Sequence, residues 1–274
     1  PPGRNKHQPQ VALVYNSQSG YSEFGRGWSF SSGGSAITRC GTTVLQDGFA
    51  DPVDYDANDK LCMDGQRLIL VSGTYMAPGS QYRKEIDDHT LVTAHGVLGN
   101  GPRYFEVLYA NGKRGYFGLL ANGTHLNNDL IVQDGNTNNI FSYRLVEYQD
   151  PYGNSILYNY GLGGLLQEIQ YDQLGGDVAR IILHDFDGYD PNALDLYVAA
   201  NTKIASPRVK QVNEIEVTLA PNYSYVYKLQ YDAEKRIDSI QPCVGNPLGY
   251  QACQPATEFE WSQPDEQTFH STAW

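Results

Sequence analysis

Two glutamates separated by one residue have the spacing of paired catalytic acids. Glu214 and Glu216 would share one face of a strand, as ADP-ribosyl transfer requires of its two acids. Any solvent-facing strand shows the same alternation, and neither a matching Arg nor a Ser-Thr-Ser strand accompanies the pair. We therefore interpret both glutamates as surface residues of a strand.

Closely spaced acidic residues in residues 185–192 could bind calcium. Asp185, Asp187, Asp190 and Asn192 supply oxygen ligands around an Asp-x-Asp-Gly core, which is similar to the calcium loops of β-propeller repeats. The later ligands are irregularly spaced, so a plain Asx turn is the alternative interpretation.

A second acidic loop places Asp54, Asp56 and Asn58 at positions one, three and five of an EF-hand pattern. Positions six and twelve of that pattern require Gly and Glu, but Asp59 and Gly65 occupy them. We interpret this loop as a solvated acidic turn.

No motif of a hydrolase or a zinc enzyme is present in the sequence. The six histidines are scattered, and neither His-Glu-x-x-His nor Gly-x-Ser-x-Gly occurs. The two carboxylates of a glycoside hydrolase are brought together by the fold and have no fixed spacing in the sequence. The sequence therefore favours no particular pair. We predict no catalytic residues and no cofactor.

Four cysteines allow three disulfide pairings. We favour Cys243–Cys253, which would close a short loop, and Cys40–Cys62 then follows by elimination. Four reduced thiols are the alternative. No Cys-x-x-Cys pair supports a zinc site.

The elements that must position these residues are predicted to be strands. Alternation with a period of two runs through residues 223–231, and it places Tyr223, Tyr225, Tyr227, Leu229 and Tyr231 on one face. Residues 214–219 alternate in the same way, and Ala220-Pro221-Asn222 joins the two runs as a turn. The pattern predicts an antiparallel hairpin.

Two further hairpins are marked by turn residues. Residues 103–110 and 113–119 flank Asn111-Gly112, which is typical of a two-residue turn. Residues 141–149 and 155–160 flank a turn in which Asp150 can accept bonds from turn amides, Gly153 can take a positive φ, and Asn154 ends the loop. Residues 165–171, 178–184 and 258–261 are predicted strands, and residues 190–199 are predicted to form the only helix, with Asp190 as N-cap and Pro191 first.

Composition supports an all-β chain and excludes several classes of function. The 274 residues include 28 Gly and 21 Tyr, and only 18% are charged. The net charge of −12 argues against nucleic-acid binding. No apolar run is long enough for a transmembrane helix. No linker divides the sequence, so we expect one β-rich unit over residues 1–274, cut from a longer protein.

Three stretches resemble a known family. The first comprises Pro1-Pro2-Gly3-Arg4, residues 8–20, Gly25-Arg26-Gly27-Trp28-Ser29 and residues 37–40; the second is residues 61–68; the third is residues 150–160, with Tyr171-Asp172 and Tyr231-Asp232 following. Together they are similar to the amino-terminal part of the Salmonella plasmid virulence protein B family, which overlaps the B components of insecticidal Tc toxins and the Rhs/YD-repeat proteins. The resemblance covers most of residues 1–172 and 223–261.

The resemblance implies a curved Rhs-shell-like sheet with at most one or two short helices. Residues 1–100 would form the virulence-protein-B-like segment, and residues 101–274 would form Rhs/YD-like hairpins. In each hairpin a Tyr would pack on the sheet while the following Asp binds the turn, and the structural residues would be Gly27, Trp28, Asp150, Gly153, Asn154, Tyr158, Tyr171, Asp172, Tyr231 and Asp232.

The function implied is that of a non-enzymatic wall segment in a secreted, extracellular bacterial toxin. Its partners would be the remaining Rhs/Tc shell and a cytotoxic carboxy-terminal cargo, with neither nucleic acid nor a membrane span involved. The alternative is a β-module that binds carbohydrate or a cell surface through exposed Tyr and Trp. An enzyme, either a glycosidase or a transferase, is the third possibility.

Overall fold

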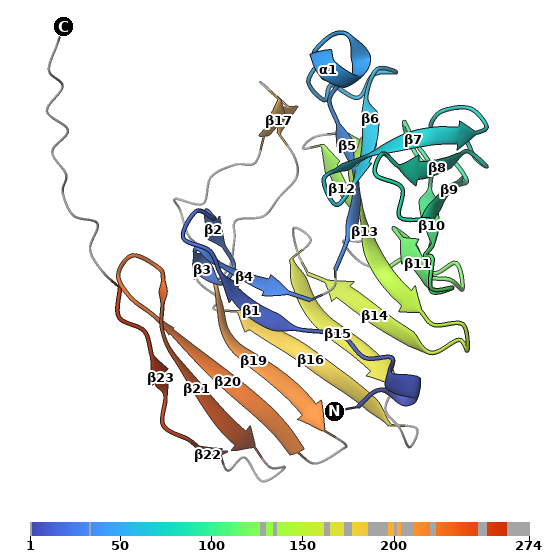
Figure 1. The fold of residues 1–274 in the computed structure, drawn as a ribbon. Coiled ribbons are helices and arrows are strands. Elements are labelled where there is room, and N and C mark those ends of the chain that lie inside the picture. The colour runs from blue at the N-terminus through green and yellow to red at the C-terminus, as the bar shows by residue number, and fades with distance from the viewer. Residues whose placement is uncertain are drawn as a thin grey trace, which may run out of the picture.

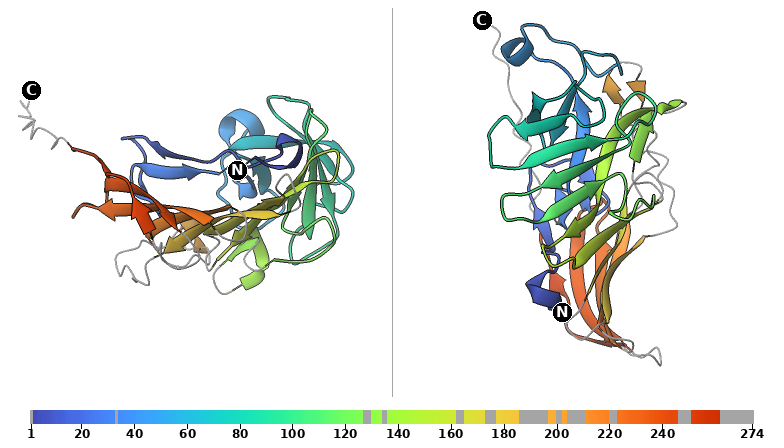
Figure 2. Two further views of the ribbon diagram at one scale, coloured as in Figure 1. Left: turned by 90° about the horizontal axis from the view of Figure 1, so that it is seen from below. Right: turned by 90° about the vertical axis from the view of Figure 1, so that its right-hand side faces the viewer.

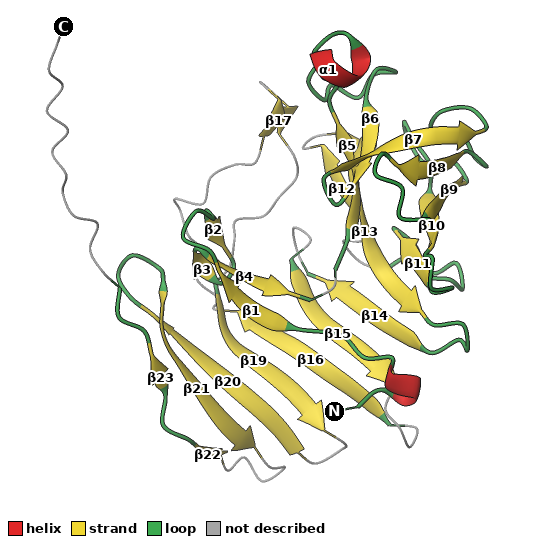
Figure 3. Ribbon diagram, viewed as in Figure 1, coloured by secondary structure: helices red, strands yellow, loops and turns green. Residues whose placement is uncertain are grey.

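The computed structural model describes residues 2–32, 34–126, 130–133, 136–161, 165–172, 177–185, 197–199, 202–203, 211–219, 223–245 and 251–261. Strands dominate the described residues, and Figure 3 shows helix in two short segments. These segments are a 3₁₀ turn, η1 (Arg4–Lys6), and one helical turn, α1 (Val44–Asp47). None of the described helices is long and apolar enough to span a membrane.

The strands follow one another along the chain as shown in Figure 1. They are β1 (Ala12–Tyr15), β2 (Tyr21–Ser22), β3 (Gly25–Arg26), β4 (Trp28–Ser31), β5 (Ala36–Cys40), β6 (Lys60–Met63), β7 (Gln66–Ser72), β8 (Gln81–Lys84), β9 (Leu91–His95), β10 (Tyr104–Leu108), β11 (Arg114–Phe117), β12 (Leu130–Gln133), β13 (Asn136–Gln149), β14 (Ser155–Tyr160), β15 (Leu166–Asp172), β16 (Val178–Asp185), β17 (Tyr197–Ala199), β18 (Thr202–Lys203), β19 (Val212–Leu219), β20 (Tyr223–Tyr231), β21 (Ile237–Gly245), β22 (Gln251–Cys253) and β23 (Thr257–Glu258).

A closed barrel forms one end of the molecule. Strands β5 to β11 pair in sequence order, β11 pairs with β13, and β13 returns to β5 to close the ring. The closing contact is antiparallel, with Ser142 opposite Thr38. Closure leaves these strands without a free edge, which removes a site of aggregation.

Strand β13 is shared by the barrel and a large open sheet. It is 14 residues long, and its last residues pair with both β11 and β14. From β14 the antiparallel sheet continues through β15, β16, β19, β20 and β21, and β21 then pairs with the short strands β22 and β23. We call the strands from β13 to β23 in this order the open sheet.

The chain before the barrel forms a second layer on the open sheet. Strands β1 and β4 pair in antiparallel fashion, and β2 and β3 pair between them. We call residues 12–31 the amino-terminal ribbon. Figure 2 shows this ribbon in blue, lying across one face of the open sheet. We call that face the covered face.

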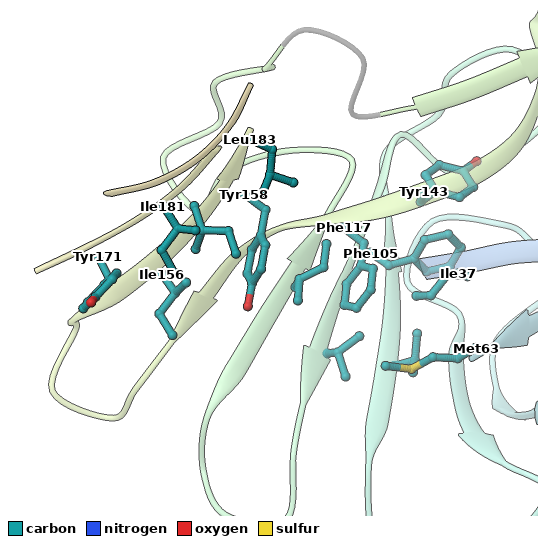
Figure 4. Packing of buried hydrophobic residues seen from close by; sticks show 14 of the residues in the cluster. Ile37, Met63, Phe105, Phe117, Tyr143, Ile156, Tyr158, Tyr171, Ile181 and Leu183 are labelled. Carbon is teal, nitrogen blue, oxygen red and sulfur yellow. The ribbon is translucent and has the colours of Figure 1, made fainter. Parts of the chain in front are cut away.

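Alternate residues of the strands fill a core that is continuous from the barrel to the open sheet (Figure 4). Inside the barrel, Phe105, Phe117 and Tyr143 are fully buried. On the covered face, Tyr158 and Ile181 are almost fully buried. This alternation is the period of two that the sequence predicts, because successive side chains of a strand point to opposite faces.

The predicted hairpins are confirmed. Strand β19 pairs with β20, β10 with β11, and β13 with β14, all antiparallel. The predicted strands at 165–171 and 178–184 are β15 and β16, whereas the strand predicted over 258–261 is confined to Thr257–Glu258.

The helix predicted over residues 190–199 is wrong where it can be tested. Tyr197–Ala199 forms strand β17, which pairs with β18, and residues 190–196 lie outside the described part of the chain. A helix this short is marginal without packing, and Tyr197 and Val198 favour strand.

Candidate functional site

Two turns of the open sheet are built around an aspartate in the same way. In the β13–β14 turn, Asp150 Oδ1 accepts hydrogen bonds from the amides of Tyr152 and Asn154, each at 2.9 Å, and Asp150 Oδ2 accepts one from the Asn154 side chain at 2.7 Å. The amide of Gly153, whose φ is +84°, donates to the Asp150 carbonyl at 3.1 Å. The predicted roles of Asp150 and Gly153 are thus present in the turn.

The turn after β20 repeats this geometry around Asp232. Its Oδ1 accepts from the amides of Glu234 and Arg236 at 2.9 Å, and its Oδ2 accepts from Arg236 Nε at 2.7 Å. Lys235 occupies the position of Gly153, with a φ of +63°. The hydrogen bonds to the turn hold the pKa of Asp232 below its usual range, against the opposing effect of burial. Residues 173–176, which follow Tyr171-Asp172, lie outside the described residues.

The predicted two-residue turn at Asn111-Gly112 is in fact three residues long. Tyr109 N donates to the Lys113 carbonyl at 3.0 Å, and Gly112, at φ +78°, donates to the Tyr109 carbonyl at 2.9 Å. Only Gly112 has a positive φ, whereas a two-residue type I′ turn would need one at Asn111 as well. The loop is therefore a type I turn followed by a left-handed residue.

The tyrosines predicted to be structural pack on the covered face. Tyr158 is 2% exposed and its hydroxyl donates to the Ser32 carbonyl at 3.4 Å, which joins the sheet to the chain after the ribbon. Tyr231 donates to the Val212 carbonyl. Burial raises the pKa of Tyr171 to about 12 and raises the pKa of Tyr158 and Tyr231 as well.

The face shared by the tyrosines of β20 is only partly covered. Leu229 is 4% exposed, whereas Tyr225 and Tyr227 are 45% and 39% exposed. Tyr225 lies opposite Val217 and Val244, and Tyr227 lies opposite Ile215. The covered face therefore continues into an exposed aromatic area, which the side-chain alternation alone does not reveal.

The Gly25-Arg26-Gly27-Trp28 motif brings the amino-terminal ribbon against the far end of the open sheet. Gly25 lies so close to the Lys235 carbonyl that a Cβ would approach it to 2.1 Å, and Arg26 N donates to this carbonyl at 2.9 Å. A Cβ on Gly27 would lie 2.6 Å from the Tyr15 ring. Both glycines have positive φ, so each meets a conformational and a steric requirement.

Trp28 is the centre of an aromatic cluster that sequence reasoning found only in part. Its ring lies 5.3 Å from Tyr15, 5.3 Å from Phe259 and 6.4 Å from Trp261, and Trp28 is 7% exposed. Trp261 also donates to the Ile237 carbonyl at 3.1 Å. We call these four side chains the aromatic seam. Phe259 and Trp261 are far from Trp28 in sequence, so no local pattern indicated the contact.

His7 fixes the chain before the ribbon to the end of β13. It is 3% exposed, its Nε2 donates to the Tyr148 carbonyl at 2.9 Å, and its Nδ1 accepts from Lys113 Nζ at 3.4 Å. Burial lowers the pKa of His7, and the nearby Lys113 charge lowers it further. The sequence showed only a solitary histidine.

The calcium site predicted over residues 185–192 stays a prediction. Asp185 ends β16, but its side chain lies outside the described part of the chain, and so do Asp187, Asp190 and Asn192.

Both favoured disulfides are present, Cys40–Cys62 and Cys243–Cys253. Each joins two paired strands, β5 with β6 and β21 with β22.

Glu214 and Glu216 lie on the face of the open sheet opposite the covered face. His184 Nε2 contacts Glu216 Oε2 at 3.0 Å, and Glu214 lies opposite His184 and Lys228 in register. Both glutamates are half-buried among charged neighbours on a sheet surface. Their surroundings are those of a surface strand.

Comparisons with known proteins define the family. The model of the Salmonella virulence plasmid 65kDa B protein family, SpvB, matches residues 1–163. Since this is more than half of the chain, the protein belongs to that family. No curated protein matches the chain.

Solved structures show the same fold. The N-terminal domain of the effector protein SpvB from Salmonella typhimurium strain LT2 is 16% identical, with a TM-score of 0.61 over 94% of this chain and 97% of that domain. The TcdB2-TccC3-Cdc42 structure is 13% identical, with a TM-score of 0.68 over 95% of this chain. The Photorhabdus luminescens Tc holotoxin pore is 13% identical, with a TM-score of 0.66 over 94% of this chain. The chain spans only 15% of each of the two Tc chains.

Proposed function

We propose that this chain is a non-enzymatic wall segment of a β-shell that encloses a cytotoxic cargo belonging to the same polypeptide or complex. Membership of the SpvB family and the fold shared with Tc toxin structures support a structural segment of a toxin. We further propose that residues 1–274 act as one unit, because the ribbon and the sheet end bind each other through the aromatic seam.

The observation that carries the proposal is the unpaired edge of the open sheet at β23. Phe259 N donates inward to the Asp238 carbonyl at 2.8 Å, so the amide of the preceding Glu258 points away from β21. Among the described strands, β23 pairs only with β21. An unpaired edge binds further strands readily, so the sheet can continue from here into a larger wall.

The two faces of the open sheet suit a wall. The amino-terminal ribbon covers part of the covered face, whereas the opposite face carries paired charges such as Arg180 and Glu168 at 3.6 Å. An antiparallel sheet with one apolar face and one charged face can pack against an interior on one side and stay hydrated on the other. Two disulfides favour an oxidising compartment, which supports the proposal of a secreted protein.

Protection of the cargo tests the proposal. Glu258→Pro in the complete polypeptide removes the outward amide of β23 and is expected to expose the cargo to limited proteolysis. Glu258→Ala keeps that amide and should protect the cargo as well as the wild type does. Full protection by the proline variant, or no binding between this chain and the remaining shell in a pull-down, would contradict the proposal.

Carbohydrate binding is a second candidate function, favoured by the exposed rings of Tyr225 and Tyr227 on one sheet face. Sugar rings stack on such flat aromatic surfaces. A glycan array probed with the purified chain should then give a signal that the Tyr225→Ala/Tyr227→Ala variant loses. A wild-type chain that binds no glycan would exclude this function for the pair.

A further inference from the structure

The loop between α1 and β6 gathers three carboxylates that no described basic group neutralises. Asp51, Asp54 and Asp56 each place an oxygen within 4.8 Å of the others. Asp54 and Asp56 are exposed and Asp51 is half-buried. Within the described part of the chain, no Lys, Arg or His forms an ion pair with any of the three.

A separate buried ion pair ties the loop to the barrel, while Asp54 Oδ1 and Asp56 Oδ1 each accept one hydrogen bond from a loop amide, that of Asp56 at 3.2 Å and that of Asn58 at 2.6 Å. Asp59 is 2% exposed, binds Arg39 Nη1 at 2.9 Å, and accepts from the Tyr55 amide at 2.9 Å. Arg39 also donates to the carbonyls of Ile140 and Asn100. The loop backbone is thereby tied to the barrel.

Thr42 supplies an independent observation at the same place. It is 6% exposed, and its Oγ1 is buried without a hydrogen-bond partner among the described atoms. Thr42 and Asp51 are direct partners in an antiparallel bridge, with Thr42 N donating to the Asp51 carbonyl at 2.9 Å. Side chains of directly opposed residues lie on the same face, so the Thr42 side chain lies on the face from which Asp51 joins the other carboxylates.

We propose that Asp51, Asp54 and Asp56 bind a calcium ion, with the Thr42 hydroxyl binding the ion or one of its waters. The donors are all oxygen, and no Cys or His is among them, which suits a hard cation. Calcium accepts several oxygens in irregular geometry, whereas magnesium demands a near-ideal octahedron. The exposure of Asp54 and Asp56 indicates an extracellular type of site, with a Kd of roughly 0.1–1 mM.

Asn58 completes the expected site. Its Nδ2 donates to Asp56 Oδ2 at 3.0 Å and lies 3.4 Å from Asp51 Oδ2, so this amide sits between two of the ligands. A half-turn of the amide presents its oxygen in place of its nitrogen, because the two ends are nearly equal in size. The ion would then replace a weak amide contact with direct coordination.

Terbium luminescence tests the site, because Tyr55 stands between Asp54 and Asp56 in the sequence and can sensitise bound Tb³⁺. The disulfide-intact chain should bind Tb³⁺, calcium should displace it, and magnesium should do so poorly. Calcium should also raise Tm by a few degrees relative to EDTA. Asp51→Asn/Asp56→Asn is expected to weaken calcium binding by about tenfold or more, and Thr42→Val to weaken it while the chain remains folded.

Glu258→Gln/Glu260→Gln is the matched control, since it removes the same charge from exposed positions far along the chain. It should bind calcium as the wild type does. Equal loss in this control would show diffuse attraction to an acidic protein and would overturn the proposal. Absence of any calcium-displaceable terbium signal in the wild type would overturn it as well.

Discussion

His7 shows how one side chain can make the stability of this fold depend on pH. Burial lowers its pKa from the ordinary value of 6.5, so the folded state holds the neutral ring while the unfolded chain takes up a proton more readily. The stabilisation by neutral His7 is therefore fully present above pH 6.5. It is lost as the pH falls from 6.5 through the lowered pKa.

We expect His7→Gln to flatten this pH dependence. The amide can still donate to the Tyr148 carbonyl but does not titrate, so the variant should lose about 1 kcal/mol at pH 8 and less relative to wild type at pH 5. Urea unfolding at both pH values measures the two differences. His89→Asn, at an exposed position, should keep the wild-type slope, and a His7→Gln slope equal to wild type would refute the role of His7.

At the scale of elements, the hairpins could be predicted because their signals are local. The alternation in residues 223–231 and the chemistry of Asp150 and Gly153 act within a few residues of each other, and both survive in the structure. Asn111-Gly112 shows the limit of such signals. The dipeptide marks the turn correctly, but the loop length depends on how β10 and β11 pair beyond it.

Contacts between distant elements could not be predicted from these patterns. Closure of the barrel depends on Ser142 meeting Thr38, and nothing local to either strand specifies its partner. The same holds for the three acidic residues of the α1–β6 loop. The sequence indicated Asp54 and Asp56, but Asp51 joins them only because Thr42 and Asp51 pair across the loop.

At the scale of the whole molecule, the aromatic seam couples the two ends of the described chain. Between described residues, two backbone hydrogen bonds join the amino-terminal ribbon to the open sheet, one from Val212 N to the Glu23 carbonyl at 2.8 Å and one from Arg26 N to the Lys235 carbonyl. Apolar packing must therefore contribute much of its attachment, through Phe24, which is fully buried in the core, and through Trp28 packed on Phe259 and Trp261. Loss of Trp28 should release the ribbon and β23 together, while the barrel stays closed by its own strand pairs.

We expect Trp28→Ala to cost about 3–5 kcal/mol of local stability, the usual range for a buried tryptophan. Hydrogen exchange should show that amides of β1, β4 and β23 lose protection in parallel, with β9 and β10 unchanged. Trp28→Phe keeps a ring and removes an indole N–H that has no partner among the described atoms, so it should retain most of the protection. Tyr21→Ala, which removes an exposed ring from β2, should change neither region. If Trp28→Ala frees the ribbon but leaves β23 protected, the two ends are independent, and the ribbon does not hold the edge strand in place for the proposed wall.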